Sequence, residues 1–105
     1  MAQFRVYENN NRTTKQRMPY LLDIQSDLLD DLQTTVVIPL CSKSIIARVV
    51  MAKLCPILEI NGEKFVALAS QLAGVERKAL GKEIGDFSHY RTEIIAAVDF
   101  LISGI

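Results

Sequence analysis

The chain has 105 residues, half of them hydrophobic, and its 12 basic residues balance its 12 acidic ones. This length predicts one domain, residues 1–105, with one modest core, and zero net charge argues against direct binding of nucleic acid or an anionic membrane while favouring self-association. The chain lacks an apolar run near the ~18 residues of a membrane span, and its first residues do not form a signal peptide, so we expect a cytoplasmic protein.

The first third of the chain predicts two strands separated by a loop. Gln3–Tyr7 alternates between polar and apolar residues and predicts a strand, and the polar stretch Glu8–Gln16 predicts an exposed loop. Tyr20–Ser26 alternates again, which predicts a second strand with Leu22 and Ile24 on one face and Leu21 and Asp23 on the other. Asp27–Asp31 follows as a loop that carries two leucines between acidic residues.

The middle of the chain contains one clear strand and one ambiguous segment. Thr34–Leu40 is β-branched and apolar and predicts a strand, in which Pro39 cannot donate to a ladder and should lie at an edge or a bulge. The apolar residues of Ser42–Lys53 have the spacing of a short helix, but their β-branching lowers its propensity.

A hairpin is the best local prediction. The apolar runs Ile57–Ile60 and Lys64–Leu68 flank Asn61-Gly62, and a type I′ turn needs two residues that tolerate positive φ. The stretch Gln71–Gly85, with three glycines and alternating charge, predicts turns and a strand.

The chain ends in a predicted helix over about Ser88–Ile102, with Ser88 as its N-cap. Apolar residues recur there at helical spacing: Ile94, Val98, Leu101 and Ile105, with Ile95 and Ile102 beside them. Chain termini are usually polar, so we expect this apolar face to be packed or reserved for a partner. Short strands followed by one helix predict a β-rich domain with a helix packed on it.

The residues do not form a recognisable catalytic or metal-binding pattern, and we expect neither a metal nor a cofactor. His89 is the single histidine, and its neighbour Ser88 would point about 100° away from it on a helix, so they do not form a nucleophile–base pair. The acidic residues near the leucine pair lack the spacing and glycine of a calcium loop. Cys41 and Cys55 are too far apart for a CxxC motif, and we expect both to be reduced and buried.

Binding is the remaining role. Leu28-Leu29 and the Gly104-Ile105 end are apolar features without an obvious internal use, although either could be part of the core. From the residues alone, the chain is a β-rich binding or interaction domain.

Several segments together resemble the CcdB toxins of toxin–antitoxin modules. They are Gln3-Phe4 with Val6-Tyr7, Asp23-Ile24-Gln25-Ser26-Asp27-Leu28-Leu29-Asp30, Val37-Ile38-Pro39-Leu40, Ser88-His89 and Gly104-Ile105. The resemblance implies a mainly β (α+β) fold, an SH3-like β-barrel with a small extra sheet and a C-terminal α-helix. It also implies a homodimer that is not an enzyme. Such toxins bind the A subunit of DNA gyrase, trap the gyrase–DNA cleavage complex, and are neutralised by a CcdA-type antitoxin.

The same resemblance implies a gyrase-binding site. Its residues are Leu28, Leu29, Asp99, Ser103, Gly104 and Ile105, and a dimer interface would include Leu101 and Ile105. Ser103 departs from the family, whose best-known poisons have tryptophan there. An aromatic anchor of this kind is worth ~2 kcal/mol or more, so its loss alone would weaken gyrase binding roughly 30-fold.

Two alternatives stay open. The MazF and Kid endoribonuclease toxins share this barrel, so the chain could cleave RNA, although the sequence does not reveal a cationic cleft. It could also be a weakened toxin that retains only antitoxin binding.

Overall fold

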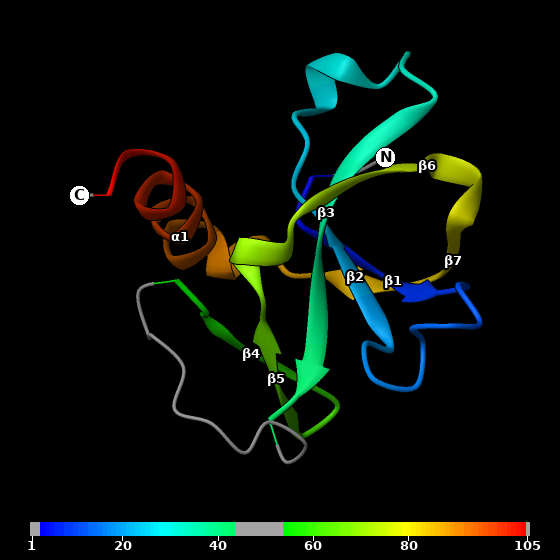
Figure 1. Ribbon diagram of the computed structural model, residues 1–105, viewed down its shortest axis with the longest axis horizontal. Helices are drawn as coiled ribbons and strands as arrows, with labels where there is room; N and C mark the ends of the chain where they lie inside the picture. Colours follow the sequence, from blue (N-terminus) through cyan, green and yellow to red (C-terminus); the bar gives the residue numbers. More distant parts are fainter. Residues whose placement is uncertain (1–2, 44–53, 105) are drawn as a thin grey trace.

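The computed structural model describes residues 3–43 and 54–104, which form a curled antiparallel sheet and one C-terminal helix (Figure 1). The strands are β1 (Arg5–Asn9), β2 (Tyr20–Asp23), β3 (Thr34–Ser42), β4 (Ile57–Ile60), β5 (Glu63–Ala67), β6 (Ala73–Glu76) and β7 (Leu80–Asp86). The helix is α1 (Arg91–Ser103), and the short 3-10 turns are η1 (Asp27–Leu29), η2 (Ala69–Gln71), η3 (Arg77–Ala79) and η4 (Ser88–Tyr90). The prediction of a barrel-like α+β fold is confirmed.

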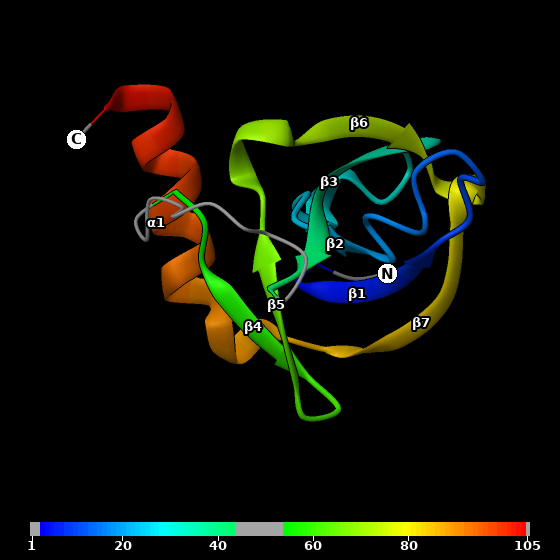
Figure 2. The ribbon, with the colours of Figure 1, turned by 60° about the horizontal axis from the view of Figure 1, so that its bottom comes forward.

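The long strand β3 joins the two parts of the sheet. Its central residues pair with β2, its first half pairs with β6, and its last residues pair with β5. The order β4-β5-β3-β2-β1-β7 therefore combines a curled half-barrel with a small β4–β5 extension (Figure 1). Figure 2 shows α1 beside that extension, while β6 and β7 curve around the opposite side.

The core lies between the sheet and α1. Its fully buried side chains include Leu22 and Ile38 from the sheet and Ile94 from the helix, each 0% exposed. The predicted second strand is present as β2, which ends at Asp23 rather than Ser26, and both of its faces are covered. Leu21 and Asp23, on its other face, are buried as well, because the curled sheet encloses that face too.

Pro39 lies within an internal strand rather than at an edge or a bulge. It faces Leu21 of β2 in a regular register. Its carbonyl oxygen accepts a hydrogen bond from the Leu68 N–H on the opposite side. The Pro39 nitrogen, which carries no hydrogen, faces that same side. Pro39 lies there between the residues of β3 that pair with β6 and those that pair with β5. The ladder therefore loses no bond there.

Other boundaries follow the predictions in part. The Asn61-Gly62 hairpin is confirmed, with φ of +53° and +83° at its two central residues. The stretch Gln71–Gly85 holds all of β6 and nearly all of β7, two strands rather than one. Ser88 begins η4 and is not the N-cap of α1, which is Tyr90.

The ambiguous segment Ser42–Lys53 falls mostly outside the described residues. Within the described part of the chain, no helix is long and apolar enough to cross a membrane.

Candidate binding surface

The β2–β3 loop (residues 24–33) presents the predicted leucine pair to solvent. Leu28 is 94% exposed and Leu29 is 47% exposed on the short turn η1, whose residues are all outside the core. A leucine left this exposed contributes almost nothing to folding, since its apolar surface stays in water. Nearly all of its transfer free energy is therefore available to a partner.

The residues around the leucine pair hold the turn in place. The Leu28 N–H donates to the Ser26 hydroxyl at 3.1 Å, and the Gln25 side chain donates to the Thr34 carbonyl at 3.1 Å. The Asp27 carboxylate accepts the Gln3 N–H at 2.8 Å. The Gln25-Ser26-Asp27 motif therefore specifies the shape of the loop through local hydrogen bonds.

A buried carboxylate supports the base of this loop. Asp23 is 1% exposed, and its Oδ1 accepts the Thr35 hydroxyl at 2.7 Å and the Gln25 N–H at 3.1 Å. Burial raises the pKa of Asp23 above the ordinary carboxyl value, and these two hydrogen bonds oppose that rise. Asp23 therefore acts as a structural acceptor at the neck of the loop.

The second predicted part of the surface is the end of α1. Asp99, Ser103 and Gly104 are all exposed there, whereas Ile105 lies outside the described residues. Gly104 has φ of +75° and caps the helix through its N–H, which donates to the Phe100 carbonyl at 2.9 Å. The Ser103 hydroxyl donates back to the Asp99 carbonyl at 2.7 Å, so it adds no apolar area for a partner.

Apolar side chains adjoin this helix end. Ile102 is 78% exposed and Leu101 is 38% exposed, while Ile95 lines a shallow hollow that also includes Asp99. Ile94 and Ala97 face the core instead. The helix thus buries one face against its own sheet and leaves a second apolar strip uncovered.

The two parts of the predicted site are separate within one chain. Both views show η1 and the C-terminal end of α1 at different places on the molecule (Figures 1 and 2). A single partner surface would have to span the gap between them, or the parts would have to come from two copies of the chain.

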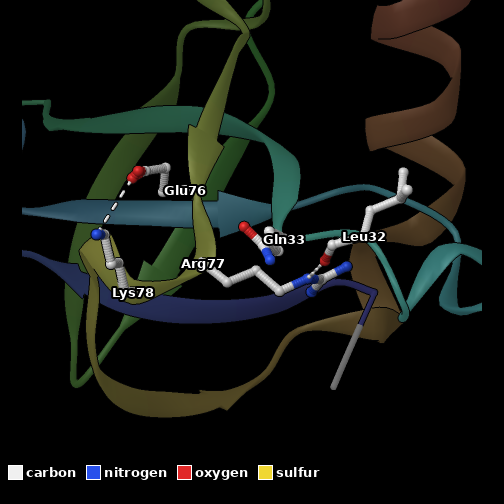
Figure 3. A pocket seen from close by; sticks show the side chains of 5 residues that line it. All are labelled: Leu32, Gln33, Glu76, Arg77 and Lys78. Carbon is white, nitrogen blue, oxygen red and sulfur yellow. Dashed lines mark hydrogen bonds and ion pairs between the residues drawn. The ribbon is translucent and has the colours of Figure 1, made fainter.

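Sequence reasoning missed Leu32, a further exposed residue of the loop, and Arg77, which contacts the loop from outside it. Leu32 is 48% exposed, and it lines a pocket with Gln33, Glu76, Arg77 and Lys78 (Figure 3). The Arg77 guanidinium donates to the Leu32 carbonyl at 2.6 Å and to the Leu29 carbonyl at 3.2 Å. The position of Leu32 beside the leucine pair was visible in the sequence, but no local signal links the loop to Arg77.

The described residues do not supply an evident catalytic or metal centre. Among them, no three His, Cys, Asp or Glu side chains are placed to hold a metal ion. The exposed His89 ring lies 4.4 Å from the Tyr90 ring and 6.0 Å from the Phe87 ring, and Arg5 forms an ion pair with Glu83.

The two cysteines are buried and unpaired, as predicted. Burial raises the pKa of both thiols, which disfavours the reactive thiolate. Packing is the role that this environment supports.

Comparison with models of protein families assigns the chain to a family. The profile of the CcdB protein family matches residues 3–104, nearly the whole chain. The chain belongs to the CcdB family. This membership supports the expectation that the protein is the toxin of a toxin–antitoxin module.

A CcdB-family chain shares its fold with proteins of quite different sequence. A solved structure described as an endoribonuclease in complex with its cognate antitoxin, from mycobacterial species, superposes with a TM-score of 0.75. The match covers 97% of this chain and 94% of that one at 12% sequence identity. At that identity the likeness concerns the fold alone.

Proposed function

We propose that this protein is a non-enzymatic toxin that binds the A subunit of DNA gyrase and traps the gyrase–DNA cleavage complex. A CcdA-type antitoxin neutralises it. Membership in the CcdB family supports this proposal, because the family match includes the β2–β3 loop and the whole of α1. The observation that carries it is the exposure of Leu28, at 94%, on a hydrogen-bonded turn.

A homodimer completes the proposed surface. Ile95 and Ile102, seven residues apart, leave an apolar strip on α1 uncovered in the single chain, and Leu101, on the side of Ile94, is partly exposed at the helix end. Pairing that strip with its copy would remove it from water, and a twofold axis there would bring the ends of two α1 helices together. Gyrase would then contact both helix ends and the β2–β3 loops.

An endoribonuclease is the second candidate function, and the structural likeness to an endoribonuclease with its antitoxin is what favours it. RNA cleavage needs a base, an acid and a cation that converge on one phosphate. The described part of this chain offers His89 against Tyr90, and Arg5 already paired with Glu83. Neither arrangement is a convergent site.

Binding to gyrase tests the first proposal against the second. The chain is titrated against a fragment containing the dimerisation region of the gyrase A subunit, and in parallel it is incubated with RNA. We expect saturable binding to the fragment and intact RNA. Cleaved RNA without binding to the fragment would replace the first proposal by the second.

A further inference from the structure

We propose that Arg77 is a positioning residue that fixes the β2–β3 loop in the conformation that presents Leu28 and Leu29 to gyrase. The inference rests on the proposed gyrase binding, and it adds a residue from a distant part of the chain to that site. Arg77 lies on η3, directly after β6, and it reaches across to the loop (Figure 3).

The loop needs such support because it has no side chain in the core beyond its first residues. All residues from 27 to 33 are exposed. A segment of this kind is not held by apolar burial, so its conformation depends on hydrogen bonds. Gln25 anchors the start of the loop to Asp23 and Thr34, but the bonds within residues 27–33 shape η1 without tying the second half of the loop to the sheet.

Arg77 ties the loop to the sheet at three points. Its Nε donates to the Leu32 carbonyl at 2.6 Å, and a terminal guanidinium nitrogen donates to the Leu29 carbonyl at 3.2 Å. Its backbone N–H donates to the Gln33 carbonyl at 2.8 Å, next to the Thr34↔Glu76 pair of β3 and β6. On the other flank, the Gln3 N–H bonds to Asp27 at 2.8 Å, so the turn is held from both sides.

The contact with the loop depends on the shape of the guanidinium group as well as on its charge. A guanidinium is planar and donates several hydrogen bonds in a fixed fork, so one Arg can bridge two carbonyls. A lysine ammonium carries the same charge without that fork. Loss of the bridge would let the loop sample other conformations. The apparent affinity for gyrase would then fall in proportion to the fraction of chains that keep the binding-competent loop.

Lys78 provides a matched control. It is the next residue, its side chain is 85% exposed, and it turns toward Glu76, 3.6 Å away, rather than toward the loop (Figure 3). Lys78→Gln removes the same charge from the same face as Arg77→Gln. The two substitutions therefore separate the loop contact from the general electrostatic attraction of gyrase.

The test uses the full chain, with Arg77→Lys, Arg77→Gln and Lys78→Gln. Heteronuclear NOEs report the order of the amides of residues 27–33 and of strands β2 and β3, and titration against the gyrase A fragment reports affinity. We expect both Arg77 variants to loosen the loop amides and to leave the strands ordered. Gyrase binding should weaken about tenfold, which corresponds to a loop that is binding-competent in about a tenth of the chains. Lys78→Gln should match the wild-type chain in both measurements.

Three results separate the possible errors. Unchanged loop order in both Arg77 variants would overturn the inference. Equal loss of affinity in Lys78→Gln would also overturn it, since charge alone would then be the cause. A wild-type chain that does not bind the fragment would refute the proposed function and the presentation to gyrase, while the loop NOEs would still decide whether Arg77 fixes the loop.

Discussion

Truncation of Leu28 separates binding from folding most cleanly. Leu28→Ala removes three carbon atoms from a side chain that is 94% exposed in the free chain. If a partner covers this side chain, the substitution should weaken the binding free energy by about 2 kcal/mol, at ~0.8 kcal/mol for each buried methylene. That is a loss of ~30-fold in affinity. Leu29 is 47% exposed, so Leu29→Ala should cost about half as much, roughly 5-fold.

Leu28→Ala should hardly change the stability of the folded chain. An exposed substitution of this kind alters stability by less than ~0.5 kcal/mol, which is a shift of less than ~3 °C in the melting temperature of a chain this size. Leu22 gives the opposite case, because it is 0% exposed, and Leu22→Ala should lose ~2–5 kcal/mol of stability.

Leu32 is the matched control for the leucine pair. Its exposed fraction, 48%, equals that of Leu29 within one per cent, and it lies in the same loop but outside the predicted gyrase site. The assay is titration of each variant against the gyrase A fragment, with melting curves alongside. Equal losses of affinity for Leu29→Ala and Leu32→Ala, or none for Leu28→Ala, would refute the assignment of the site to the leucine pair.

Four further predictions concern other parts of the chain. Leu101→Asp should dissociate the proposed dimer in sedimentation experiments at micromolar concentration, because the interface would bury an unpaired charge; a dimer that persists would move the interface elsewhere. Ser103→Trp should tighten gyrase binding by up to ~2 kcal/mol of cation–π attraction, about 30-fold, in the same titration; unchanged affinity would mean that gyrase does not reach this position. Replacement of Cys41 or Cys55 by alanine should lower the melting temperature and leave gyrase affinity unchanged, and loss of binding by a folded variant would give the thiols a functional role. Because burial raises the pKa of Asp23 in the folded state, wild-type stability should fall as pH rises from the ordinary carboxyl value of 3.8 through that raised pKa. Asp23→Asn should flatten this dependence of stability on pH in a urea-denaturation series, and an unchanged dependence would mean that Asp23 is not its source.

Local chemistry accounts for what the sequence predicted well. The Asn61-Gly62 turn needs only its own two residues to tolerate positive φ, and both have it. The leucine pair was recognisable because two large apolar residues stood between acids without a periodic pattern around them. Its exposure follows from the same local composition, since the flanking Asp side chains favour water.

Tertiary context accounts for the differences. Pro39 could be placed inside the sheet only once β5 and β6 were known to leave its missing N–H without a required partner. Ser88 resembles an N-cap, yet Asp86 accepts its N–H at 2.8 Å and the chain first makes a 3-10 turn. The contacts of Arg77 with the β2–β3 loop join residues more than 40 positions apart, and no local pattern encodes them.

A gyrase cleavage assay tests the central claim most directly. Gyrase, ATP and supercoiled plasmid are incubated with the protein, with and without a synthetic peptide of the antitoxin C-terminal segment, and trapped complexes are released as linear DNA. We predict linear plasmid that depends on the protein and disappears when the peptide is added. Absence of linear plasmid at protein concentrations that saturate the gyrase A fragment would contradict the account.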